Sequence, residues 1–439
     1  MSQAAVARWV LSLATAMAWG AGMAQAQPVP APAPPAGGFE IIELPPLAPP
    51  ATEAGPRPGE EATTARARGL ESWNFSAHAT ADFGNPNESS LLNPGNAALR
   101  LRDSGSYLEV RASASDRLDA IKDLRWLIKT FAASSDDSPT APATRARFDE
   151  VFVDWRRDRW FASIGKRRVN WGHASAFNPV NVVAPPRDPL EPAFQTEGRR
   201  LAWVSYSGPG TVDLLLTRNE ACGPTQWGLR WDGSAGTKSG ALYFFDGRKG
   251  NDGSDFGRML GASFSMDVVP GLTFYGEAAR FSVNDRRYYG DAGEPVQKAS
   301  GFQQAVLGSQ LDLGGRSRAN VEIFRNGRGY SRDERSNYFD ALRAPLGRGV
   351  RATDFEVLAM NRLYGLLSFR KEVREQYAGT ATLLAAADGS FSARAEIAYT
   401  VSDYYEVKGV YVRSGGGRGT EFGNSLYRDL FQLQLSASF

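Results

Sequence analysis

Apolar and polar side chains alternate along most of the chain after Trp73, and the alternation is unbroken in the last nine residues. Successive side chains of a strand point to opposite faces, so an alternating segment forms one apolar and one polar face. The apolar face here holds Phe431, Leu433, Leu435, Ala437 and Phe439, opposite Gln432, Gln434, Ser436 and Ser438. An amphipathic strand of a soluble sandwich has the same pattern, but such chains rarely end on the strand itself. The ending therefore favours a strand with lipid on one side and water on the other.

About eighteen such strands can be marked out, each about ten residues long, which is the length that a tilted strand needs to cross a bilayer. They begin near Trp73, Tyr107, Lys122, Arg147, Trp160, Arg200, Thr211, Gln226, Ser239, Arg258, Leu272, Phe302, Arg318, Leu358, Tyr377, Phe391, Tyr404 and Leu430. In one of them Ile397 lies on the apolar face and Arg394 and Glu396 on the other, where these charges avoid lipid. The sequence predicts an all-β fold, a transmembrane antiparallel up-and-down β-barrel of about 18 strands, with 16 as the second choice.

The links between these strands are alternately short and long, as in barrels with short periplasmic turns and longer external loops. Short links include Arg156 to Arg159 and Ser402-Asp403, and long links include 170 to 198 and 326 to 357. One external loop, Asp388 to Ser390, is short and breaks the rule. An even number of strands predicts that both termini lie on the periplasmic side.

The first seventy residues differ in composition from the rest. Residues 1–26 have the layout of a secretory signal peptide, with Arg8, an apolar segment from Trp9 to Trp19, and the small-residue site Ala24-Gln25-Ala26. Residues 27–70 are rich in proline, which opposes both helix and ladder, so we expect a disordered periplasmic tail. The barrel is expected over 71–439. Beyond the signal peptide no run of about 18 apolar residues is available for a spanning helix.

Composition agrees with a barrel that has a wet interior. Lys and Arg number 50 and Asp and Glu 48, so net charge gives no reason to expect a nucleic-acid partner. Mean hydropathy is −0.35, as expected when half of each strand faces water. The single cysteine, Cys222, cannot form an internal disulfide.

The C-terminal pattern resembles the closing-strand signal of bacterial outer-membrane proteins. The assembly-signal residues are Phe431, Leu433, Leu435 and Phe439. The resemblance implies the outer membrane of a Gram-negative bacterium, with barrel-assembly machinery and outer-membrane lipids as partners. A periplasmic partner of the proline-rich tail and assembly as a homotrimer are further options that the sequence leaves open.

About sixteen to eighteen strands leave an aqueous channel, so charged residues on the polar faces are candidates for the channel wall. The pore-lining candidates are Glu109, Arg111, Asp213, Glu322, Arg362, Arg394, Glu396, Glu406 and Lys408. Each of them also fits a structural ion pair between neighbouring strands. Both signs are present, so ion selectivity stays open.

The most distinctive segment begins Gly165-Lys166-Arg167-Arg168-Val169-Asn170-Trp171-Gly172 and continues with Phe177-Asn178-Pro179-Val180-Asn181. It resembles a strand-and-loop signature of large, uncharacterised porin-like barrels, including those related to alginate-export channels. The resemblance implies that 170–198 is a constriction loop, with Asp188, Glu191 and Glu197 opposing Lys166, Arg167 and Arg168. Asn181 stands where this signature often has an acidic residue. An external flap stiffened by proline is the alternative.

We expect no enzyme and no cofactor. The two histidines are His78, within the first strand, and His173, near Ser175 in the long loop. A Ser/His pair oriented by Asp188 is conceivable, but nothing in the sequence fixes the three groups in contact. No phosphate-binding glycine loop and no Cys/His metal cluster occurs in the sequence.

The function expected from these patterns is passive diffusion of small hydrophilic solutes through an outer-membrane channel. One alternative is an export pore for an exopolysaccharide, an anionic glycan like alginate, that works with periplasmic partners. A second is an occluded barrel with an adhesive or structural role. The solute, the direction of transport, the oligomeric state, and whether 170–198 or the tail closes the lumen stay open.

Overall fold

The computed structural model describes residues 72–117, 123–136, 143–184, 188–191, 197–218, 225–247, 256–291, 293–298, 300–343 and 352–439. All of them belong to one compact unit. The predicted signal peptide (1–26), the predicted tail (27–70) and Cys222 lie outside the described residues.

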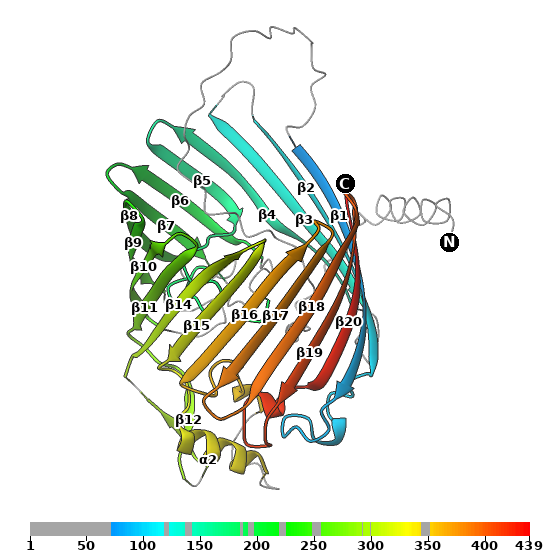
Figure 1. Cartoon of the computed structure of the whole chain (residues 1–439). Coiled ribbons are helices and arrows are strands. Elements are labelled where there is room, and N and C mark those ends of the chain that lie inside the picture. Colours follow the sequence, from blue (N-terminus) through cyan, green and yellow to red (C-terminus); the bar gives the residue numbers. More distant parts are fainter. Residues whose placement is uncertain are drawn as a thin grey trace, which may run out of the picture. The chain divides into compact units, whose positions relative to one another are not determined.

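Eighteen strands of the described part form a single sheet (Figure 1). They are β1 (Ser72–Pro86), β2 (Ser104–Arg117), β3 (Leu124–Ser135), β4 (Ala143–Arg157), β5 (Trp160–Arg167), β6 (Arg199–Ser207), β7 (Thr211–Arg218), β8 (Thr225–Ala235), β9 (Lys238–Asp246), β10 (Arg258–Val269), β11 (Leu272–Phe281), β14 (Phe302–Gly314), β15 (Ser317–Asn326), β16 (Leu363–Val373), β17 (Tyr377–Ala386), β18 (Phe391–Ser402), β19 (Tyr405–Gly415) and β20 (Tyr427–Ser438).

Each of these strands pairs antiparallel with the next one along the chain, and β1 pairs with β20, which closes the sheet into a barrel. The closing register places Phe83 opposite Phe431 and Ala81 opposite Leu433. The backbone N–H of Phe439 donates to the carbonyl of Phe75 at 2.8 Å, and the Phe439 ring stacks on Tyr404. The predicted up-and-down barrel of 18 strands is therefore confirmed, and closure leaves no free sheet edge.

The two faces of each strand differ as the alternation predicts. In β18, Ile397 is 67% exposed, whereas Arg394 is 6% and Ala398 7% exposed. Large apolar side chains are exposed on the outer face of nearly every strand, and polar and charged side chains are buried on the other. In a closed barrel the buried face is the interior, so the apolar surface faces outward, as a membrane-spanning barrel requires.

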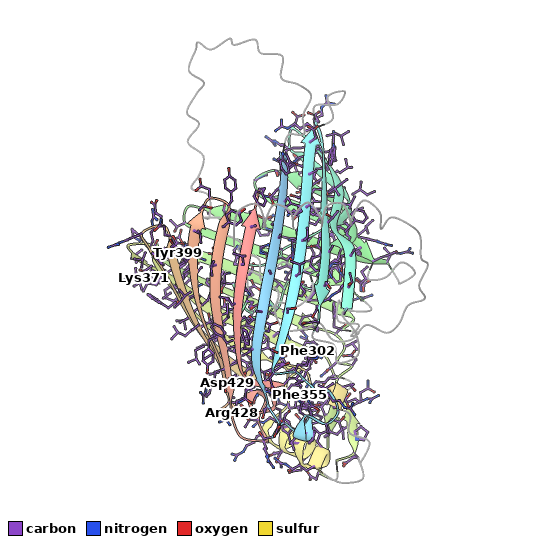
Figure 2. All side chains as sticks on the ribbon, turned by 90° about the vertical axis from the view of Figure 1, so that its right-hand side faces the viewer. Phe302, Phe355, Lys371, Tyr399, Arg428 and Asp429 are labelled. Atoms are coloured by element: carbon purple, nitrogen blue, oxygen red, sulfur yellow. The ribbon has the colours of Figure 1, made fainter. Side chains whose placement is uncertain are left out.

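The two ends of the barrel differ in their links. One end, called the turn end below, has short links such as Asp158-Arg159 and Pro270-Gly271; the other, the loop end, carries the long segments. Figure 2 shows Lys371 and Tyr399 near the turn end, and Phe355, Arg428 and Asp429 toward the loop end. The strand predicted to begin near Leu358 begins at Leu363, because Leu358 has a φ of 67° and its N–H donates to Glu421 in a neighbouring loop.

The loop end also contains elements that the alternation did not predict. These are α2 (Arg332–Arg343), the small sheet of β12 (Arg287–Tyr289) and β13 (Pro295–Gln297), and the 3-10 turns η1 (Pro94–Asn96), η2 (Ala352–Asp354) and η3 (Phe422–Asn424). Figure 1 shows α2 and β12 beyond the same end of the barrel. No helix within the described ranges has the length and apolar character required to cross a membrane.

Candidate functional site

The described residues 168–184 and 188–191 of the link between β5 and β6 lie inside the barrel and are called the inner loop below. Trp171 contacts Tyr243 and Phe245 on β9, with ring centroids 5.6 and 6.2 Å apart. Phe177 stacks on Phe324 of β15 at 4.7 Å, and Glu191 forms an ion pair with Arg394 of β18. These strands are far apart around the sheet, and only the interior is adjacent to all of them. The inner loop therefore crosses the lumen.

Apolar packing holds the first part of the inner loop. Trp171, Val180 and Val183 are at most 1% exposed and join inner-face side chains of β6 to β14 in one cluster. The other members of that cluster include Leu201, Leu215, Ala241, Tyr243, Phe245, Met259, Ala279, Phe281 and Phe302. A second cluster joins Phe177 to inner-face residues of β11 to β17, including Tyr275, Val306, Phe324, Tyr364, Leu366 and Leu384. We call these two sets of inner-face residues the apolar wall.

Two glycines allow the inner loop to approach the strands this closely. Gly228 lies on the inner face of β8, where a Cβ atom would be 2.6 Å from the Trp171 ring. Gly172 has a φ of +94°, which favours glycine, and a Cβ there would be 2.3 Å from a carboxylate oxygen of Glu277. The Trp-Gly pair of the sequence motif is thus the point at which the loop meets the barrel wall.

Two buried carboxylates fix the backbone of the inner loop. Glu322 on β15 accepts hydrogen bonds from the N–H groups of Ser175 and Phe177 at 2.8 and 2.9 Å, and from the hydroxyl of Tyr275 at 2.7 Å. Glu277 on β11 accepts from the N–H groups of His173 and Ala174 at 2.5 and 2.7 Å. Glu277 was not among the sequence candidates, although its polar position within an alternating strand marked it as inward-facing.

Asparagines stabilise the turn of the loop. Asn178 donates from its side chain to the carbonyl of Trp171 at 2.6 Å. The side-chain oxygen of Asn181 accepts from the N–H of Trp171 at 3.3 Å, and its amide donates to Asn170 at 3.1 Å. Asn181 therefore anchors the loop with its amide, at the position where an acidic residue is frequent in the motif that this segment resembles.

The three basic residues at the end of β5 face in different directions. Lys166 has the outward parity of Ile164, and its ammonium group contacts Glu197 and the carbonyl of Phe148. Arg167 faces inward, forms an ion pair with Asp154, and lies over the Phe152 ring at 4.4 Å. They do not form one cationic group.

The third basic residue, Arg168, joins a charged network on the inner face of β2 to β4. Its guanidinium lies 3.5 Å from Asp149, which also contacts Arg111 at 3.2 Å and Arg147 at 2.8 Å. The β3–β4 register shifts between Lys129 and Thr130, so that Asp149 and the adjacent Glu150 both face the interior. Asp149, Glu150 and Arg147 were missed by the sequence analysis because period-two alternation fails at a bulge.

The three acidic residues of the loop are likewise separated. Glu197 pairs with Lys166 and lies 3.6 Å from Arg147, whereas Glu191 pairs with Arg394 across the lumen. Asp188 accepts from the N–H of Leu190 at 2.9 Å. The predicted opposition of all three to residues 166–168 is therefore present only for Glu197.

Burial dominates the ionisation of Glu191. It raises the pKa of the carboxyl to about 8, against the lowering effect of Arg394 and Lys408, while Asp188 and Glu396 raise it further. Burial also raises the pKa of Asp188, with Leu190 and Arg394 acting in the opposite direction. The segment 188–191 is thus held against β18 by the hydrogen bond from Arg394 to Glu191, whose carboxyl ionises at a higher pH than an exposed glutamate would.

Most of the predicted pore-lining residues face the interior as charged neighbours. Arg394 and Glu396 lie 2.7 Å apart, and Lys408 is 3.3 Å from Glu396 and 4.0 Å from Glu406. Among the remaining candidates, Glu109 pairs with Arg111, Asp213 lies 3.4 Å from Arg230, Glu322 anchors the loop, and Arg362 precedes β16. Arg362 donates to the carbonyl of Gly329 at 3.2 Å, within the loop end.

The inner face from β18 through β20 and β1 to β4 carries many polar and charged side chains, with a few apolar ones such as Phe131 and Val410 between them, and we call it the polar wall. Between its charged groups lie Gln432, which donates to Asp82 at 2.9 Å, and His78, whose Nδ1 is 2.9 Å from the Ser436 hydroxyl. The side chains of Lys129 and Arg147 are 34% and 31% exposed. The inner loop thus packs against the apolar wall, and the polar wall carries most of the charged groups of the interior.

The side chains of His173 and Ser175, the conceivable Ser/His pair of the sequence, have different hydrogen-bond partners. His173 lies between the hydroxyls of Ser263 at 2.8 Å and Ser239 at 3.2 Å, and burial lowers its pKa. The Ser175 hydroxyl donates to Glu322. Within the described ranges, no group of three or more His, Cys, Asp or Glu side chains is arranged to hold a metal ion.

Comparison with known proteins gives structural neighbours only. No protein-family model matches the chain, and no curated protein matches it. A variant of the Rhodopseudomonas blastica porin is 9% identical over 84% of this chain and 99% of the porin, with a TM-score of 0.43. A triple mutant of the same porin is 10% identical over the same shares, with a TM-score of 0.42. The barrel fold described above is established by the chain's own strand pairing.

Proposed function

We propose that this chain is an outer-membrane channel through which small hydrophilic solutes diffuse passively, along the polar wall and beside the inner loop. A barrel of about eighteen strands is wide enough for an aqueous channel. Its apolar outer face suits a bilayer, and short turns at one end with long loops at the other fit the outer membrane of a Gram-negative bacterium.

The polar wall is the observation that best supports a channel. The apolar wall is covered by the inner loop, and its residues Leu215, Phe245 and Met259 are 0% exposed. The charged residues on the opposite side keep partial exposure at Lys129, Arg147 and Arg168. Since charged side chains are stable in a barrel when they face water, this sector supports an off-centre path.

The pairing of charges favours neutral or weakly charged solutes over an anionic polymer. Arg111, Arg147 and Arg168 share Asp149, and Lys408 lies near both Glu396 and Glu406. An exporter of a polyanion needs an excess of cations along its path, as in other sites that bind anionic chains. Hydroxyl-rich solutes can instead form hydrogen bonds with both the cationic donors and the carboxylate acceptors.

Single-channel recording of the purified protein in a planar bilayer tests this function. We expect ohmic steps under a salt gradient, and the variant Lys129→Glu should shift the reversal potential toward cation selectivity. Heat-modifiable gel migration shows that each preparation is a folded barrel. Electrical silence of a folded wild-type barrel contradicts the proposal and favours the occluded, adhesive or structural alternative.

A further inference from the structure

Three basic side chains follow one another along the inner face of β3 and β4, from the loop end toward the turn end. They are Arg145, Arg147 and Lys129, and we call them the cation row. Arg145 is opposite Ala133 and Arg147 is opposite Phe131, and both of these neighbours are buried on the inner face. Lys129 is the next residue of β3 on the same face after Phe131. The cation row therefore lies on the polar wall.

The cations of the row are more exposed than the carboxylates that pair with them. The side chains of Lys129 and Arg147 are 34% and 31% exposed. Those of their partners Glu150 and Asp149 are 9% and 2% exposed. Coulomb energy falls with distance, so the charge nearest to a solute has the largest effect on it. A solute in the lumen therefore meets the positive member of each pair.

Arg145 adds a positive charge at the loop end of the row. Its side chain is exposed, and among the described residues no carboxylate lies within ion-pair distance of its guanidinium. The exposed Glu197 lies 3.6 Å from Arg147 instead, and it is shared with Lys166 of the outer face. A channel wall that presents charges of one sign raises the local concentration of counter-ions. Arg145 is thus placed to attract anions at the entrance of the row.

The ion pairs of β18 and β19 have the opposite order. There the side chains of Arg394 and Lys408 are each 6% exposed, whereas Glu396 is 20% and Glu406 16% exposed. The contact of Glu191 with Arg394 places the inner loop against this sector. A solute at the polar wall therefore meets exposed cations on β3 and β4, and less exposed carboxylates on β18 and β19.

We propose that the cation row determines which solutes this channel favours, namely small hydrophilic solutes that carry a single carboxylate. Arg145 attracts the carboxylate at the loop end, and Arg147 and Lys129 contact it further along the wall. The guanidinium fork of the arginines matches the two oxygens of a carboxylate. A polyanion gains less, because the buried Asp149 and Glu150 oppose its additional charges. This inference rests on the proposed channel function and names its solute class.

Tracer exchange into proteoliposomes of the purified protein tests the row, with gluconate as the probe and glucose as an uncharged solute of similar size. Equal concentrations inside and outside avoid a net movement of charge. We expect gluconate to exchange faster than glucose through wild type. The double variant Arg145→Gln/Lys129→Gln should lower the gluconate rate about fivefold, the order of effect of a unit charge close to a solute in water, and leave the glucose rate unchanged.

Three further variants separate charge from folding. Arg145→Gln alone removes a side chain without a carboxylate partner among the described residues, so it should keep the fold and lower the gluconate rate in part. Lys129→Arg keeps the charge and should exchange gluconate as wild type does. Arg332→Gln removes an exposed cation of α2, beyond the same end of the barrel (Figure 1), and should also leave the gluconate rate unchanged. Heat-modifiable migration establishes that each variant is folded.

The outcomes distinguish failure of this inference from failure of the channel function. Equal rates of gluconate and glucose through wild type would overturn the inference. Equal lowering of both rates by the double variant, or a loss of gluconate exchange in Arg332→Gln as large as in the double variant, would do the same. If neither solute exchanged faster than in protein-free vesicles, the channel function itself would be wrong, and the solute class with it.

Discussion

Glu322 is a carboxylate with 0% exposure whose hydrogen-bond donors come from the inner loop and from Tyr275. The sequence analysis marked it as a wall residue, and the same inward position allows it to serve as an anchor. A single inward glutamate thus fixes three consecutive residues of the loop, because the N–H groups of Ser175, Ala176 and Phe177 have it as their common acceptor.

Replacing this anchor should release the loop. We expect Glu322→Ala to lower the free energy of unfolding by about 3 kcal/mol, because buried N–H groups lose their acceptor, and to enlarge the single-channel conductance. Glu372→Ala is the matched control, since this carboxylate on β16 is 39% exposed and is paired with the exposed Arg370. Urea titration and bilayer recording of both variants measure the two effects. Identical behaviour of the two variants would show that Glu322 does not hold the loop.

A substitution at Ile397 tests whether the outward face of the barrel contacts lipid. It lies near the middle of β18 and is 67% exposed, so an arginine there would enter the hydrocarbon. We expect Ile397→Arg to cost about 2–4 kcal/mol of folding free energy in lipid vesicles, the range for a charge near the midplane. Ile397→Leu keeps an apolar side chain and should leave folding nearly unchanged. An arginine variant as stable as the leucine variant would place this face away from lipid.

The inner loop has two kinds of attachment. Its first part is packed against the apolar wall through Trp171 and Phe177. Its later part, 188–191, is attached through the contact of the titratable Glu191 with Arg394, beside Asp188, Glu396 and Lys408. Apolar packing is insensitive to pH, whereas the Glu191 carboxyl titrates, so the two parts should respond differently to pH.

The direction of the pH dependence follows from the pKa of Glu191. This pKa is about 8 in the docked loop, whereas the ordinary value is 4.5. Between these values the docked loop holds more protons than the released loop, so docking of 188–191 weakens as pH rises and is weakest once the pH exceeds the docked pKa. We expect more frequent conductance fluctuations at about pH 9 than at about pH 6. Glu191→Gln cannot ionise and should remove the difference. A pH response that persists in this variant would assign it to another group.

Much of the barrel was predictable from the sequence because each strand repeats a period-two pattern that one face in lipid enforces. Leu358 was taken as a strand residue because apolar character alone does not separate the end of a loop from the start of a strand. The helix α2 was missed, although Ser331 and Glu334 form a capping box, in which the Ser331 N–H donates to Glu334 at 2.7 Å. The helix lies within a long loop, where a search for alternating apolar and polar residues does not detect a helix.

The candidate site was less predictable than the barrel. The motif from Lys166 to Asn181 identified the loop, but not its partners, because Glu277, Tyr243 and Arg394 are distant in sequence. Asp149 was missed since a bulge shifts the parity of β4 by one residue. The direction of Lys166 differs from that of Arg167 for the simpler reason that adjacent strand residues face opposite sides.

At the scale of the whole molecule, the lumen is divided between an apolar wall covered by the inner loop and a polar wall that spans the closure of the barrel at β20 and β1. The closing strands thus have two roles, since their outward residues Phe431, Leu433, Leu435 and Phe439 face lipid while Gln432 and Gln434 continue the polar wall. The central claim is that solutes pass along this wall.

The most direct test of that claim is chemical modification during single-channel recording, in a Cys222→Ser background. Lys129→Cys places a thiol on the polar wall, where the native side chain is 34% exposed, and Gln304→Cys places one on the inner face of β14, near the apolar wall. A bulky thiol reagent should reduce the conductance of the Lys129→Cys channel in a single step and leave the Gln304→Cys channel unchanged. Loss of conductance at Gln304→Cys, with none at Lys129→Cys, would contradict a path along the polar wall.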